Sequence, residues 1–321
     1  MRRLSMIAGL LAFATSVCAQ SWPTKPVRLL VSTGPGMATD ILGRIVADRL
    51  SRSLGQTFVV ENIAGAGGIV AAQNVARAAP DGYTMLFTGG GVLVTNAFAF
   101  KSLPYDAARD FVPVALVTRA SGFMVLATPT LPVKNIAELV ALAKAQPGKL
   151  SYAVDVSNIY VSLAGRMINH AAGTDITEIP YKAIALAMQD TMAGRTQLIL
   201  SSNTSAEPAV RSGKLKLLAV TSSRRLPGWP DTPTLQETWP ALKLDAVGFT
   251  VVAPAALPKD VLGRANQALN ALLRDKGFEE QIAVQGQPLA APNTPEEAAE
   301  VLQEQRARWG KIFQDLAIQP Q

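Results

Sequence analysis

Strand-like and helix-like segments alternate along almost the whole of this chain. Because parallel strands need a crossover, usually a helix, between them, this alternation predicts an α/β fold with largely parallel sheets. Strands are expected at Val27–Ser32, Phe58–Glu61, Thr84–Thr88, Val114–Thr118, Phe123–Thr128, Leu150–Val154, Thr177–Ile179, Gln197–Leu200, Leu215–Val220 and Val247–Ala253. Helices are expected at Thr39–Ser53, Gly68–Ala78, Ile136–Ala145, Tyr160–Ala172, Ile184–Ala193, Lys259–Leu273, Phe278–Val284 and Pro295–Leu316.

The first strand-to-helix turn is the segment most suggestive of binding. The apolar run Val27–Val31 meets Gly34-Pro35-Gly36, and a helix with apolar residues at helical spacing follows over Ile41–Leu50. The N-terminus of a helix offers free N–H groups and a partial positive charge, so it binds anions without a cationic side chain. The turn therefore predicts an anion site, with an ordinary structural turn as the alternative.

The N-terminal segment has the pattern of a secretory signal. Arg2 and Arg3 precede the short apolar stretch Met6–Val17, and Val17-Cys18-Ala19 has the small-residue spacing of a cleavage site. The apolar stretch is too short to span a membrane. We predict a signal peptide over residues 1–19, cleavage near Ala19 and export to the periplasm. The alternative, a lipid anchor on Cys18, is disfavoured because Val17 stands where a small residue is expected.

The composition removes several kinds of chemistry. Cys18 is the only cysteine and His170 the only histidine, so no His/Cys metal cluster forms and a Ser-His-Asp arrangement would need His170. The chain has no GxxxxGK phosphate loop, no G-x-S-x-G elbow and no HExxH. We expect no catalytic residue, no metal and no cofactor, and hence no enzyme.

Charge argues against nucleic acid as a partner. Arg2 and Arg3 lie in the predicted signal, leaving 28 basic against 24 acidic residues in the rest of the chain. These charges are scattered, and basic residues do not interleave with aromatic ones. Mild positive charge is compatible with attraction of anions, although a solubilising surface explains it equally well.

Ordered motifs along the chain make it similar to one family. They are Trp22-Pro23-Thr24-Lys25-Pro26-Val27-Arg28, Val59-Val60-Glu61-Asn62, Gly65-Ala66-Gly67-Gly68, Ala79-Pro80-Asp81-Gly82-Tyr83-Thr84, Leu103-Pro104-Tyr105-Asp106, Asp110-Phe111, Pro180-Tyr181-Lys182, Gly213-Lys214-Leu215, Leu218-Ala219-Val220-Thr221, Asp231-Thr232-Pro233-Thr234, Thr294-Pro295-Glu296-Glu297 and Arg308-Trp309. In order and spacing the chain resembles the Bug-type periplasmic solute-binding receptors of tripartite tricarboxylate transporters.

The resemblance implies a two-lobed type II periplasmic-binding-protein fold with an interlobe ligand cleft. Crossovers between lobes are expected near Arg119–Gly122 and Asp245–Gly248. Lobe one would comprise residues 22–121 plus 248–318, and lobe two residues 122–247. The implied partners are a small organic carboxylate and integral membrane transporter subunits, and we expect a monomer.

The resemblance also suggests where the ligand binds. The family's first ligand loop typically reads Pro-Pro-Gly-Gly-x-x-Asp and corresponds to Gly34–Asp40, with Met37 in place of the second glycine. Its second loop typically reads Ala-Gly-x-Gly, and the corresponding run Asp155–Ser162 lacks both glycines. Ala183 replaces a usual glycine, and Ser201 a common acidic residue. The predicted ligand-binding residues are Thr33, Gly34, Pro35, Gly36, Met37, Ala38, Thr39, Asp40, Gly89, Gly90, Ser157, Asn158, Ile159, Tyr160, Lys182, Ala183 and Ser201.

Several of these residues have simpler structural interpretations. Asp40 is able to cap or orient the first loop instead of touching ligand, since a carboxylate beside a bound anion is unfavourable unless hydrogen-bonded. Ser157 and Asn158 suit helix capping as well as a polar clamp. Gly89 and Gly90 either approach the ligand or supply unusual backbone angles. Lys182 is more typical of a solvated or hinge ion-pair residue than of a ligand group.

The altered loops suggest a ligand with one carboxylate. We expect it at Gly34–Thr39, with an apolar, aromatic or amine-bearing remainder against Met37 and Tyr160, while Asp155 repels a second carboxylate. The alternative is that the loops have drifted and bind poorly. For the whole protein, the alternatives to a transport receptor are a ligand sensor for a membrane signalling system and, more remotely, an exported hydrolase.

Overall fold

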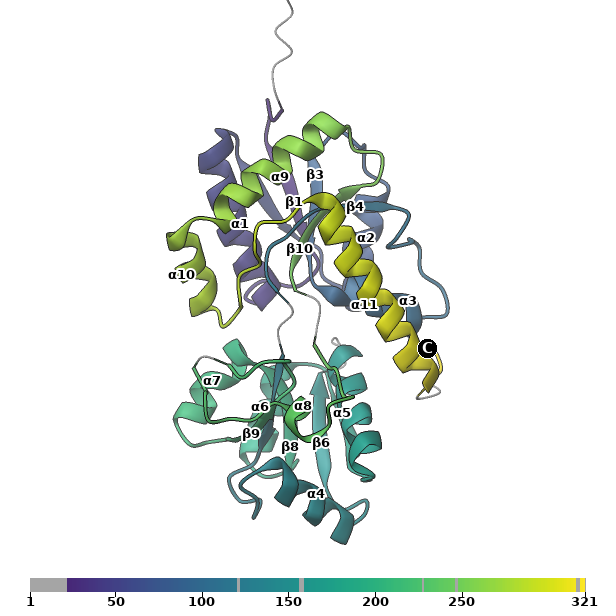
Figure 1. Cartoon of the computed structure of the whole chain (residues 1–321), viewed down its shortest axis with the longest axis vertical. Helices are drawn as coiled ribbons and strands as arrows, with labels where there is room; N and C mark the ends of the chain where they lie inside the picture. Colours follow the sequence, from purple (N-terminus) through teal and green to yellow (C-terminus); the bar gives the residue numbers. More distant parts are fainter. Residues whose placement is uncertain are drawn as a thin grey trace, which may run out of the picture.

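The computed structural model describes residues 22–119, 122–155, 159–226, 228–245, 248–315 and 318–320. Two five-stranded sheets form two lobes, one above the other in Figure 1. The upper sheet has the order β2-β1-β3-β10-β4 and the lower sheet β7-β6-β8-β5-β9. The strands are β1 (Val27–Val31), β2 (Phe58–Asn62), β3 (Thr84–Thr88), β4 (Phe111–Leu116), β5 (Phe123–Ala127), β6 (Ser151–Asp155), β7 (Thr177–Tyr181), β8 (Leu198–Ser202), β9 (Lys216–Val220) and β10 (Thr250–Pro254).

Helices surround both sheets. The upper lobe carries α1 (Ala38–Leu54), η1 (Ala66–Gly68), α2 (Ile69–Ala76), η2 (Gly91–Thr95), α3 (Asn96–Ala99), α9 (Lys259–Leu273), α10 (Lys276–Val284) and α11 (Pro295–Asp315). The lower lobe carries α4 (Ile136–Ala145), α5 (Ile159–Ala172), α6 (Ile184–Met192), α7 (Asn203–Arg211) and α8 (Leu235–Thr238).

The upper sheet is buried on both faces. Leu29 and Val31 of β1 belong to an apolar cluster with residues of α1 and α9, whereas Leu30 between them belongs to a cluster with residues of α2 and α11. Successive side chains of a strand point to opposite faces, so a strand covered on both sides reads as a continuous apolar run. This is why Val27–Val31 is apolar throughout apart from Arg28.

In each sheet, the fourth strand in the order given above runs antiparallel to its two neighbours. β10 runs antiparallel to β3 and β4, and β5 runs antiparallel to β8 and β9. These are the strands that the chain forms directly after it passes from one lobe to the other, so they start at the edge where the neighbouring strands end. The expectation of largely parallel sheets is thus correct for the remaining strands.

The structure corrects some predicted boundaries. β4 covers Phe111–Leu116 instead of Val114–Thr118, and Thr118 forms only an isolated bridge with Leu289. β10 begins at Thr250 instead of Val247. Sequence reasoning missed α7, a short helix of low apolar content, because Pro208 within it argues against a helix there.

Along the described parts of the chain, no helix combines the length and the apolar character needed to cross a membrane. The predicted signal peptide, residues 1–19, lies outside them.

Candidate functional site

The carboxyl ends of three strands of the upper sheet lie at one edge. Thr88 at the end of β3 is opposite Thr250, and Thr250 is opposite Leu116 at the end of β4. Val31, the last residue of β1, pairs with Phe87. Both crossovers meet the upper sheet at this edge. The first leaves it after β4, and the second enters it before β10. The predicted loop after β1 and the glycines after β3 therefore lie on the side facing the lower lobe.

The lower sheet places its own candidates at the edge facing the upper lobe. Phe123, at the start of β5, is opposite Ser202, and Asp155 at the end of β6 pairs with Tyr181 at the end of β7. Asp155, the Tyr181–Ala183 turn and Ser201 thus share this edge. The structure brings the described predicted residues onto two edges that the crossovers join, which is where ligands bind in open α/β sheets.

Asp40 holds the first loop together. Its carboxylate accepts hydrogen bonds from Gly36 N (2.8 Å) and Asn62 Nδ2 (2.8 Å), and it pairs with Arg44 Nε at 2.9 Å. Burial alone would raise the pKa of Asp40, but the three donors bring that pKa below its ordinary value. With a side chain only 5% exposed, Asp40 orients the loop from beneath.

Asn62 belongs to the same hydrogen-bond network, although sequence reasoning did not single it out. Besides Asp40, its Nδ2 donates to Thr33 O at 3.0 Å, so one amide connects the end of β2 to both ends of the loop. The only available signal was its place in the family motif Val59-Val60-Glu61-Asn62.

The N-terminus of α1 has no side-chain cap. Met37 is the N-cap residue and makes no side-chain hydrogen bond to the first turn, which leaves the early N–H groups for another acceptor. Pro35, Gly36 and Met37 are exposed, Met37 by 41%, and Thr33 Oγ1 is buried without a partner. A free helix N-terminus beside a rigid loop is suited to a carboxylate.

Gly89 and Gly90 lead into η2, which is a π-helical turn. Such turns are rare and frequently occur at functional sites. A side chain at Gly89 would contact the ring of Phe249 at 3.5 Å, so the backbone here passes close to the start of β10.

The lower lobe contributes Asp155, Lys182, Ala183 and Ser201 to the candidate site. Asp155 is buried, Lys182 is exposed, and Ala183 is the N-cap residue of α6 without a side-chain cap. Ser201 is 1% exposed, and its Oγ has no hydrogen-bond partner. Ser157 and Asn158 lie outside the described residues, as does the side chain of Ile159.

Tyr160 is enclosed between the lobes. Its ring stacks on Phe123 at 4.8 Å between centroids and meets Trp309 of α11 edge-on at 5.4 Å. The hydroxyl lies 3.4 Å from Thr221 Oγ1, and burial raises the pKa of Tyr160. With 6% of its surface exposed, Tyr160 has little area left for a ligand, so its predicted contact with one stays a prediction.

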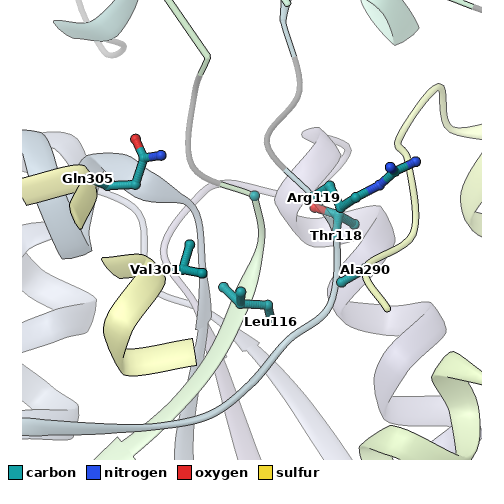
Figure 2. Close-up of a pocket in the computed structure, with 7 residues that line it drawn as sticks. Leu116, Thr118, Arg119, Ala290, Val301 and Gln305 are labelled. Atoms are coloured by element: carbon teal, nitrogen blue, oxygen red, sulfur yellow. The ribbon is translucent and has the colours of Figure 1, made fainter. Parts of the chain in front are cut away.

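A small pocket beside the crossovers, at the end of β4, contains none of the predicted ligand-binding residues. It has a volume of about 160 Å³ and is lined by Leu116, Thr118, Arg119, Gly248, Ala290, Val301 and Gln305. In Figure 2 the guanidinium of Arg119 extends away from Val301 and Leu116. A mainly apolar lining without an inward-pointing cation does not suit a carboxylate.

Among the residues that the structure covers, no group of three or more His, Cys, Asp or Glu side chains could hold a metal ion.

The two lobes face each other across the ends of their strands, and α1 and α6 both begin there without a side-chain cap, an arrangement that suits ligand binding between the lobes. The family model described as the tripartite tricarboxylate transporter family receptor matches residues 42–318, so the chain belongs to this family. The predicted resemblance and the two-lobed α/β fold are thereby confirmed.

Relatives and solved structures agree with this assignment. A UPF0065 protein of Bordetella bronchiseptica is 34% identical, covering 99% of this chain and 94% of its own. BugT of Bordetella pertussis is 30% identical over 98% of each chain. Rpa4515 of R. palustris, solved with adipate, superposes with a TM-score of 0.85 at 31% identity over 94% of this chain and 100% of its own. MatC of Rhodopseudomonas palustris, solved with malate, gives 0.78 at 27% over 91% and 99%.

Proposed function

We propose that this periplasmic solute-binding receptor holds a small organic carboxylate between its lobes and delivers it to the membrane subunits of a tripartite tricarboxylate-type transporter. The observation that carries the proposal is the uncapped N-terminus of α1, next to a loop that Asp40 fixes from beneath. Export with cleavage near Ala19, a monomeric state and lobe boundaries at 121/122 and 247/248 are parts of the same proposal.

The ligand's first carboxylate would lie on the N–H groups of the Gly34–Thr39 turn. Met37, exposed beside that turn, offers apolar contact for the remainder of the ligand. Asp155 on the opposite edge disfavours a second carboxylate close to it. The receptors solved with adipate and malate hold dicarboxylates, so the choice between one and two carboxylates is the first question for experiment.

A thermal-shift screen of the mature protein addresses both points. Adipate, malate and citrate are compared with aromatic and amine-bearing monocarboxylates, and each hit is repeated with its neutral amide. A ligand at 100 times its Kd stabilises a protein by about 2.7 kcal/mol, which is readily seen. We expect at least one acid to give a saturable shift that its amide does not reproduce. Absence of any saturable shift would refute carboxylate binding.

Two further measurements separate transport from the alternatives. NMR of the bound acid after long incubation should return it unchanged, whereas an exported hydrolase would convert it. Uptake of the same acid by cells with and without the receptor tests delivery. Uptake that does not depend on the receptor would favour a sensing role.

A further inference from the structure

Arg308-Trp309 is a motif to which the proposed ligand site assigns no role. Both residues lie on α11, and this helix packs on β4, η2 and α3 of the upper lobe. Arg306 Nη1 donates to Leu93 O at 3.2 Å, and Phe313 meets Phe98 at 5.6 Å between centroids. These contacts fix α11 to the upper lobe on both sides of the motif.

Trp309 reaches from this helix into the lower lobe. Only 1% of it is exposed, and its ring contacts Tyr160 in the first turn of α5. Tyr160 in turn stacks on Phe123, which begins β5 just after the first crossover. Phe123 N donates to Thr221 Oγ1 at 2.8 Å, so the aromatic contact is tied to the end of β9 as well.

Arg308 bonds to the chain just before the second crossover between the lobes. Its Nη2 donates to Asp245 O at 2.6 Å, and its Nη1 lies 4.0 Å from Asp245 Oδ2. Asp245 is the last described residue before the second crossover, and its Oδ1 accepts from Ser223 N at 2.7 Å. A second acceptor, Gln305 Oε1 on the same helix, holds the guanidinium in place. Arg308 Nε is buried without a partner, so burial of this side chain carries a desolvation cost.

We propose that Arg308 and Trp309 are positioning residues for ligand binding: they set the orientation of the lower lobe, and of the first turn of α5, relative to the upper lobe. This inference rests on the proposed interlobe binding. Arg308 bonds to the residue just before the second crossover, and Trp309 contacts, through Tyr160, the strand that follows the first. Both act from a helix that the ligand does not need to touch. Only molecules in the binding-competent lobe orientation bind ligand, so apparent affinity falls in proportion to their fraction. Loss of the Arg308 or Trp309 contacts lowers that fraction and so weakens binding.

The chain contains a matched control for each residue. Arg306 also donates through its guanidinium to a backbone carbonyl, but within the upper lobe. Phe313 is also a buried aromatic of α11, but its partner Phe98 belongs to the upper lobe. Arg308→Gln is therefore compared with Arg306→Gln, and Trp309→Leu with Phe313→Leu.

Binding of the acid found in the screen, with adipate as first probe, is measured by calorimetry. Arg308→Gln and Trp309→Leu are expected to weaken it about tenfold, a common size for coupling between sites, and both controls less than about threefold. Arg308→Lys, which keeps one charged donor, should restore part of the loss. Equal losses in all four variants, or no loss in Arg308→Gln and Trp309→Leu, would overturn the proposal.

Hydrogen exchange of the amides of residues 163–166, which donate to the carbonyls of the first turn of α5, gives a readout that needs no ligand. Arg308→Gln and Trp309→Leu should speed exchange there, while the two controls should leave it near the wild-type rate. If the wild-type protein binds no acid, the proposed function fails by itself, and exchange alone decides the positioning role. Exchange that is unchanged in the two test variants, or equally fast in the controls, refutes it.

Discussion

The two lobes stabilise their strand-to-helix turns in different ways. After β1, the turn before α1 is held by a buried carboxylate with three donors from its own neighbourhood. After β6, the first turn of α5 is held by the ring of Tyr160, which stacks on Phe123 of its own lobe and contacts Trp309 of the other lobe. The polar network lies within the upper lobe, so the turn before α1 (the first turn below) does not depend on lobe orientation. The first turn of α5 (the second turn below) does depend on it, because one of its partners belongs to the other lobe.

The largest effect is expected for Asp40→Ala, which removes the support of the first turn. Gly36 N and Asn62 Nδ2 lose their acceptor, while Arg44, half-exposed, turns to water. We expect a loss of about 2 kcal/mol in unfolding free energy and a loss of affinity of about 100-fold, measured by urea unfolding and calorimetry.

The control for Asp40 lies on the same helix. Asp48 forms an exposed pair with Arg52 at 2.9 Å, and Asp48→Ala should change stability by less than about 0.5 kcal/mol. If Asp40→Ala destabilised the protein but left affinity intact, the first turn would not be part of the ligand site.

Glycines that face the strands give a second comparison. A Cβ at Gly165 of α5 would lie 2.3 Å from the ring of Tyr152, whereas one at Gly43 of α1 would lie 2.9 Å from Val31 Cγ2. The Tyr152 ring is held by its hydroxyl's bond to Glu178 and has little freedom to move. Gly165→Ala should therefore cost about 2 kcal/mol of unfolding free energy and Gly43→Ala about 1 kcal/mol.

Urea unfolding of both variants measures these costs, and ligand titration then separates the lobes. Because Gly165→Ala displaces the helix that carries Tyr160, it should also weaken binding. Equal stability losses with unaltered affinity would contradict the dependence of the second turn on close packing between α5 and β6.

Acid should weaken the first turn through Asp40. Its pKa is below the ordinary value of 3.8, so in the range below 3.8 the unfolded chain takes up a proton that the folded chain does not. This contribution to stability is present at neutral pH and is lost as pH falls through the folded-state pKa. In urea unfolding across that range, Asp40→Asn should show a shallower pH dependence than the wild type, and parallel curves would contradict this.

The contrast between a local network and a contact between lobes also explains which features could be predicted from the sequence. The first turn was predictable because Gly36 and Asp40 are neighbours in the chain and belong to one local motif. The contact of Tyr160 with Trp309 was not predictable, because it depends on how two lobes are placed and leaves no local periodicity. The antiparallel directions of β5 and β10 escaped prediction for a similar reason, since the crossovers determine them. The strands themselves were found within a few residues, because apolar β-branched runs bounded by turns are local signals.

The smallest effect is expected for Tyr160→Phe, which tests whether the second turn is held by the ring or by the hydroxyl. The hydroxyl lies at 3.4 Å from Thr221 Oγ1, which already accepts from Phe123 N at 2.8 Å. Its removal should cost less than about 0.5 kcal/mol of unfolding free energy. In Tyr152→Phe, the lost bond is a 2.7 Å contact with the Glu178 carboxylate, so a cost above about 1 kcal/mol is expected. If urea unfolding gave equal costs for the two variants, the hydroxyl of Tyr160 would share in the support that we assign to its ring.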